Sequence, residues 1–147
     1  FNITQKYLKK DGYILLGLYN KYGRVRTIIR KYFYKIFGKS IIMILDPTLR
    51  NIKKDSTRQI MAWIQDQYEH PIERLHTLDE VLLWFDENNI EFINSIPSCN
   101  LEKDSIDELF DKKSRGTIFS RIFSQIFMIF NRLGSDGGLF VVIGKKR

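Results

Sequence analysis

The sequence predicts an α/β fold in which buried strands alternate with amphipathic helices. Three short, apolar-rich runs lack the regular polar alternation of half-exposed strands, and they span residues 13–18, 90–96 and 139–143. The segments between these runs repeat apolar residues at helical spacing. The composition, 44% hydrophobic and 28% charged, is ordinary for a chain that buries a core.

The first strand is expected at residues 13–18, directly after the turn signal Lys-Lys-Asp-Gly at residues 9–12. A helix is expected at residues 24–37, where apolar and basic residues take opposite sides, and Gly38 ends it. Its apolar positions are Val25, Ile28, Ile29, Tyr32, Phe33, Ile36 and Phe37. The chain before the first strand, residues 1–10, resembles the tail of a helix whose beginning is missing.

The middle of the chain is expected to hold two more helices and a loop. Asp46-Pro47 marks a break, and a helix is expected at residues 55–67. A polar loop is expected at 68–76, because the residue before Pro71 is biased away from helical geometry. Thr77 and Glu80 have the spacing of a capping box, which predicts a helix at 78–88 leading into the second strand.

The last third predicts a polar segment, a long helix and the final strand. Residues 100–114 are expected to form a loop with a short helix around 106–110. A helix at 117–133 carries an apolar face that we expect to pack inside the protein, and a turn at 134–138 enters the last strand. The apolar face consists of Ile118, Phe119, Ile122, Phe123, Ile126, Phe127 and Phe130.

The charge distribution bears on which partners to expect. The net charge is +7, but it divides into +11 over residues 1–60, −11 over 61–111 and +7 over 112–147. Such blocks can face one another in the folded protein, so a self-complementary surface is expected rather than a nucleic-acid site. Cys99 is the single cysteine, and no Cys/His cluster has zinc-ligand spacing, which favours a cytoplasmic setting without a metal.

The number of strands indicates that the chain is part of a larger sheet. Three strands that are apolar on both faces would leave much apolar surface and an open edge in water. We therefore expect the chain to be the C-terminal part of a larger domain, with an N-terminal half of the same domain as its missing partner.

The segment YLKKDGYILLGLYN at residues 7–20 resembles the leader helix, turn and fifth strand of class I S-adenosylmethionine-dependent methyltransferases. Residues 78–96 are similar to the helix leading into strand six of that family, and GGLFVVIG at 137–144 to its antiparallel final strand. The segments at 17–24, 66–71 and 75–77 are similar to those of a bacterial and archaeal subgroup of the family that has a helical insertion after strand five. The resemblance implies strands five to seven of a Rossmann-like seven-stranded sheet, with 19–76 as a helical insert on the acceptor side.

The resemblance also implies that the cofactor-binding segments of the family are missing from this chain. The family binds S-adenosylmethionine through a glycine-rich turn after strand one and an acidic residue after strand two, and neither segment is found here. The glycine-rich stretch at 134–138 precedes a strand instead of linking a strand to a helix. We expect S-adenosylmethionine to be the cofactor of the full-length parent and this chain alone to bind none.

The acceptor site of such an enzyme is expected at the carboxyl ends of the strands. Tyr19, Asn20, Tyr22 and Arg24 follow the first strand and are substrate-side candidates, although Tyr22 and Arg24 could equally cap or solvate the next helix. A second group of candidates, which could supply a base, a polar rim or structural hydrogen bonds, is Asp66, Gln67, Tyr68, His70 and His76. The methyl acceptor and the catalytic residue stay open.

A different class of function stays open as well. The basic amphipathic helix at 24–37 is also compatible with an interaction module that binds acidic partners or an anionic membrane surface. For the helix at 117–133, a role at a membrane surface stays open as an alternative to packing.

Overall fold

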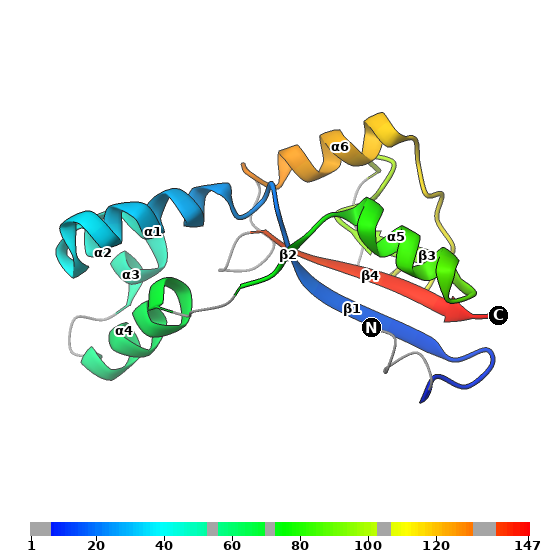
Figure 1. Ribbon diagram of the computed structural model, residues 1–147, viewed down its shortest axis with the longest axis horizontal. Helices are drawn as coiled ribbons and strands as arrows, with labels where there is room; N and C mark the ends of the chain where they lie inside the picture. The colour runs from blue at the N-terminus through cyan, green and yellow to red at the C-terminus, as the bar shows by residue number, and fades with distance from the viewer. Residues whose placement is uncertain (1–6, 53–55, 70–72, 103–106, 131–137) are drawn as a thin grey trace. The chain divides into compact units, whose positions relative to one another are not determined.

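The computed structural model describes residues 7–52, 56–69, 73–102, 107–130 and 138–147, and the chain divides into two compact units. The sheet unit comprises Phe1–Gly23 and Leu75–Arg147, and the helical unit comprises Arg24–Arg74 (Figure 1). The described residues have an α/β fold, as the sequence predicted. They form one four-stranded mixed sheet, with one strand more than expected, and six α-helices.

The sheet has the order β2-β1-β4-β3. Its strands are β1 (Tyr13–Asn20), β2 (Leu75–His76), β3 (Ile90–Ile96) and β4 (Leu139–Lys146). Strand β1 is parallel to β2, while β4 runs antiparallel to both β1 and β3, with Val142 opposite Leu16 on one side and Ser95 on the other. Strands β1, β2 and β3 therefore point the same way, and their carboxyl ends share one edge of the sheet.

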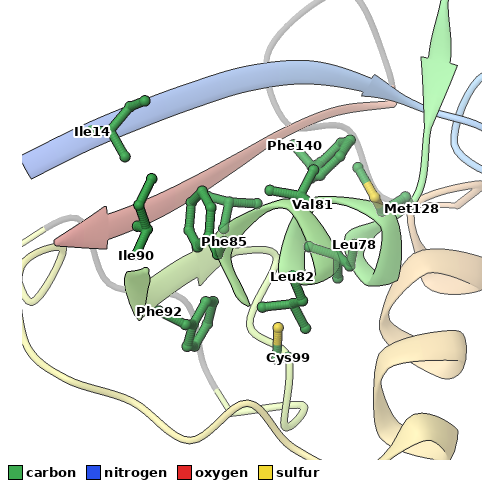
Figure 2. Close-up of a cluster of buried hydrophobic side chains, with 11 residues drawn as sticks. Ile14, Leu78, Val81, Leu82, Phe85, Ile90, Phe92, Cys99, Met128 and Phe140 are labelled. Atoms are coloured by element: carbon green, nitrogen blue, oxygen red, sulfur yellow. The ribbon is translucent and has the colours of Figure 1, made fainter. Parts of the chain in front are cut away.

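The core of the sheet unit lies between the sheet and α5 (Leu78–Glu87). Thr77 and Glu80 form the predicted capping box at the start of α5. The helix buries Leu78, Val81, Leu82 and Phe85, which meet Ile14, Ile90, Phe92 and Phe140 from three strands (Figure 2). Phe85 is fully buried, and removing such a ring costs about 3–5 kcal/mol.

The helix α6 (Ile118–Phe127) buries its polar side, whereas its apolar face was expected to be buried. Ser124 and Gln125 are buried, whereas most of the predicted apolar face is exposed. The exposed members are Ile118, Phe119, Phe123, Phe127 and Phe130. The polar side of α6 is buried because it finds hydrogen-bond partners in the interior. For example, Ser124 Oγ donates to the Ser98 carbonyl at 2.8 Å.

The helical unit contains α1 (Val25–Phe37), α2 (Lys39–Leu45), α3 (Pro47–Asn51) and α4 (Thr57–Ile64), followed by a π-helical turn at Gln65–Glu69. Its small core consists of Ile42, Leu49, Ile64 and Tyr68. Gly38 ends α1 with a φ of 71°, a left-handed value that favours glycine. Asp46 caps α3 by accepting a hydrogen bond from the Thr48 amide, and Pro47 occupies the first turn.

Several boundaries differ from the expectation. Tyr68 lies in the π-helical turn and residues 75–76 form β2, so the loop expected at 68–76 is shorter than predicted. Residues 107–110 form a turn instead of the expected short helix. Residues 8–9 are irregular, and the turn at 9–12 is confirmed by the Gly12 amide, which donates to the Lys9 carbonyl. The turn expected at 134–138 lies almost wholly outside the described residues.

The predicted charge complementarity is seen inside each unit. In the sheet unit, basic side chains of the last block pair with acidic ones of the central block, in Arg115–Asp86, Arg121–Asp79 and Lys112–Glu91. In the helical unit, Arg24 and Lys31 of the first block both pair with Glu73 of the central block. Opposite blocks therefore neutralise one another in part.

Candidate functional site

The carboxyl edge of the sheet brings together three of the residues expected there. Asn20 ends β1 directly opposite His76, which ends β2, and Tyr19 lies between Leu75 and Leu139. The Lys21 amide donates to the His76 carbonyl at 3.0 Å, which continues the pairing beyond the strands. Parallel strands thus place the end of β1 and the start of α5 side by side, although they are far apart in sequence.

Asn20 has a positioning role at this edge. Its side chain is 0% exposed, and its Oδ1 accepts hydrogen bonds from the amides of Tyr22 at 2.9 Å and Gly23 at 3.2 Å. Its Nδ2 donates to Gln125 Oε1 at 2.9 Å. These contacts hold the turn after β1 from inside, as asparagine side chains commonly do. The structure therefore gives Asn20 internal partners and sets the half-buried Tyr22 on the turn that Asn20 fixes.

Gln125 is the residue at this edge that the sequence analysis missed. It is 1% exposed, and its Oε1 also accepts from the Leu78 amide at 2.9 Å, one of the free amides at the start of α5. Its Nε2 donates to the Arg121 carbonyl at 3.1 Å. One side chain of α6 thereby joins the end of β1 to the beginning of α5. The sequence signal that could have identified Gln125 is its place as a polar residue within a helix rich in apolar residues.

His76 is held in one orientation by Glu80. The distance from His76 Nδ1 to Glu80 Oε2 is 3.1 Å, and the same oxygen accepts from the Thr77 amide at 3.1 Å. The imidazole also meets the ring of Trp84 edge-on, with 5.0 Å between centroids. Because a carboxylate only accepts, the Nδ1 of a neutral His76 carries the proton and its Nε2 keeps a lone pair. The pair has the base-and-orienting-carboxylate arrangement used in proton transfer.

The helical unit brings Arg24, Gln67 and Asp66 together. Arg24 is buried, and its guanidinium donates to Gln67 Oε1 at 3.0 Å and pairs with Glu73. Gln67 Nε2 in turn donates to Asp66 Oδ2 at 2.7 Å, and Lys31 Nζ lies 2.8 Å from Glu73. Arg24 stands at the N-cap position of α1 without a side-chain capping bond, and its guanidinium binds side chains within the helical unit.

Tyr68 takes part in a different cluster, centred on Asp46. The carboxylate of Asp46 is buried and accepts from Tyr68 Oη at 2.6 Å and Trp63 Nε1 at 2.9 Å, while Arg30 lies 3.3 Å away. Burial alone would raise the pKa of Asp46, but the hydrogen bonds from Tyr68, Trp63 and Thr48 and the charge of Arg30 outweigh it and lower that pKa. Burial and the bond to Asp46 raise the pKa of Tyr68. Tyr68 is thus a neutral hydrogen-bond donor inside this unit.

The remaining predicted candidate, His70, lies outside the described residues. Asp46 and Glu80 were not singled out as site residues, although Glu80 was identified for its capping role. Within the described ranges there is no group of three or more His, Cys, Asp or Glu side chains placed to hold a metal ion. No helix in that same part of the chain is long and apolar enough to cross a bilayer.

Neither of the turns that leave β1 and β2 offers a glycine-lined space for a ligand. Of the turns that leave β1 and β2, only the first carries a glycine, Gly23. A Cβ at Gly23 would lie 2.5 Å from the Cα of Gly138 and 3.2 Å from Met128 Cβ, so the space that a glycine leaves there is filled by the protein itself. A depression of about 370 Å³ lies near the amino end of β3, lined by charged residues that include the pairs Asp86–Arg115 and Glu91–Lys112. That place is at the opposite end of β3 from the candidate site.

Comparison with protein-family models finds no match to this chain, and comparison with curated proteins finds no significant match.

Proposed function

We propose that this chain carries the acceptor-substrate side of an S-adenosylmethionine-dependent methyltransferase, the part that contains strands five to seven. The observation that carries the proposal is the position of β4, the last strand, which runs antiparallel between β1 and β3. An antiparallel final strand is what the resemblance implies. The turn at 9–12, the strand β1 and the capped helix α5 before β3 support it further, since they occur in the implied order.

The sheet also has room for further strands. Strand β2 pairs only with Tyr19 and Asn20, the last two of the eight residues of β1. On the other side of the sheet, the segment after residue 107 contacts the edge of β3, where the Lys113 amide donates to the Ile93 carbonyl at 2.8 Å. A sheet that continues beside residues 13–18 would therefore grow from β1, where the cofactor-binding strands of the parent enzyme are expected.

The acceptor would bind at the carboxyl edge, where ligands of open α/β sheets bind. Tyr19 and Tyr22 would contact it, Asn20 would position Tyr22, and His76 would take up its proton at Nε2 while Glu80 holds Nδ1. Such proton uptake contributes about 10²–10⁴-fold to a reaction rate. S-adenosylmethionine would supply the methyl group, bound by residues outside this chain.

The test is methyl transfer by the whole protein encoded by the reading frame that contains this segment. We expect isothermal titration calorimetry to detect S-adenosylmethionine binding to that protein and none to the 147-residue chain. Labelled methyl groups should pass from the cofactor into an extract of the source cells. The His76→Asn variant should keep cofactor binding and lower transfer at least a hundredfold, while Glu87→Gln at the exposed end of α5 should change neither. A whole protein that binds no S-adenosylmethionine would refute the proposal.

A further inference from the structure

The helices α1 and α2 are joined at Gly38, and both expose apolar side chains. The polar side of α1 packs within the helical unit, where Thr27 is buried and Arg30 and Lys31 pair with Asp46 and Glu73. The apolar side of the same helix is exposed. We call the outward group the corner surface, and it consists of Tyr32, Phe33, Ile36, Phe37, Ile44 and Leu45.

The exposure of the corner surface is large for residues of this kind. Ile36 is 71% exposed, Phe37 60% and Ile44 65%, and Phe33 stacks on Phe37 with 6.1 Å between ring centroids. Apolar residues of this size, grouped together on the surface, mark places where a protein meets a partner or a membrane. The grouping indicates that this corner has an apolar counterpart.

The charges around the corner surface identify that counterpart. Residues 24–52 contain seven Lys or Arg side chains and a single acidic one, Asp46, which is only 2% exposed. The exposed charge of this stretch is therefore positive, and the carboxylates that reach α1 from elsewhere, Glu69 at Tyr34 and Glu73 at Lys31, lie on the side of α1 that carries Thr27. Lys35 and Lys39 are exposed beside Ile36 and Phe37 on either side of Gly38. Aromatic and aliphatic side chains bordered by lysine, without carboxylates, are the pattern of helices that lie in the interface of an anionic membrane.

We propose that the corner surface docks on an anionic membrane, with Phe33, Ile36 and Phe37 entering the boundary between headgroups and acyl chains. The 13 residues of α1 span about 20 Å, a length suited to lying in the membrane plane. Lys35 and Lys39 contact anionic headgroups, and each contributes about 1 kcal/mol, or about fivefold in partitioning. Binding to an anionic bilayer requires apolar side chains that can enter it and positive charge beside them, and the corner surface has both. This inference is independent of methyl transfer.

The test is co-sedimentation of the chain with vesicles of phosphatidylcholine alone and of phosphatidylcholine with phosphatidylserine. Binding is expected only with phosphatidylserine and should weaken as salt is raised. The Ile36→Ala/Phe37→Ala double variant should reduce partitioning at least tenfold, and each of Lys35→Gln and Lys39→Gln about fivefold. Circular dichroism should show unchanged helix content, because all four side chains are exposed.

The matched control uses α6, whose apolar side chains are equally exposed. Phe119→Ala/Phe123→Ala removes two such rings from the sheet unit and should leave vesicle binding unchanged. Loss of binding in this control, with binding kept in the α1 variants, would overturn the proposal. So would equal binding to neutral vesicles or no binding to either kind. Soluble polyglutamate that binds as tightly as the anionic vesicles, with the same dependence on Ile36 and Phe37, would instead identify an acidic protein as the partner.

Discussion

Replacing Gln125 with leucine tests whether one buried amide holds the carboxyl edge together. Its Oε1 is the acceptor for Asn20 Nδ2 and for the Leu78 amide, and both donors are 0% exposed. Leucine would leave the two donors without this acceptor, at about 1–3 kcal/mol each, and its apolar volume would recover about 1 kcal/mol. We therefore expect the free energy of unfolding to fall by about 3 kcal/mol, within a range of about 1–5 kcal/mol, which is a large share of the stability of a typical domain.

The assay is equilibrium urea unfolding, with amide hydrogen exchange as a local readout. A loss of this size moves the urea midpoint by about 1–2 M for a small domain. Exchange of the Leu78 amide should accelerate more than that of amides in the middle of β4, because its acceptor is removed directly. The control is Gln59→Leu on an exposed position of α4, which should change stability by less than about 0.5 kcal/mol. Equal midpoints for the two variants would refute the role assigned to Gln125.

Three further outcomes follow from the packing and the titrating groups. The folded pKa of Asp46 lies below its unfolded value, so its stabilising contribution is present above the unfolded pKa, about 3.9, and is lost as the pH falls toward the folded pKa. Acid titration of the Asp46→Asn variant should therefore show a shallower loss of stability over that range. A slope equal to that of the unmodified protein would contradict the hydrogen-bond network around Asp46. A Cβ at Gly144 would lie 2.4 Å from Ile90 Cγ2, so Gly144→Ala should cost about 1–3 kcal/mol in thermal unfolding, whereas Gly17→Ala in the neighbouring strand should cost little, since its nearest atom would be 3.9 Å away. Burial raises the pKa of the Cys99 thiol, so its reaction with Ellman's reagent should proceed at the rate of unfolding, and fast labelling of the native protein would argue against its buried position.

Strong local patterns predicted most of the fold. The three apolar runs became β1, β3 and β4, and the capping box at Thr77 and Glu80 located the start of α5. Strand β2 was missed because two residues are too few to show a period, and it exists only through pairing with the end of β1. The short helices α2 and α3 were missed because each is shorter than the window in which helical spacing can be recognised.

The orientation of α6 was wrong for a different reason. Periodicity identified an apolar face correctly, but it does not specify whether that face points to the core or to water. The buried side was determined by partners distant in sequence, since Gln125 meets Asn20 across 105 positions. Such partners are not visible in a single sequence.

The candidate site was predicted as a location rather than as a set of contacts. The sequence placed Asn20 at the carboxyl end of a strand and His76 in a loop, and the structure pairs the two residues across β1 and β2. It did not reveal that Asn20 has internal partners or that Arg24 is enclosed by Gln67 and Glu73, because burial of a polar residue depends on its three-dimensional neighbours.

The position of β4 has a consequence for how the protein is made. Strand β4 is synthesised after the other three strands of the described sheet, yet it lies between β1 and β3 and pairs with both. While the ribosome still holds residues 139–146, β1 and β3 have no shared neighbour, and the core beneath α5 lacks Phe140 and Val142. The sheet unit therefore assembles only after these residues leave the exit tunnel, so a stop codon shortly before Leu139 would yield a nascent chain that chaperones and proteases recognise as unfolded.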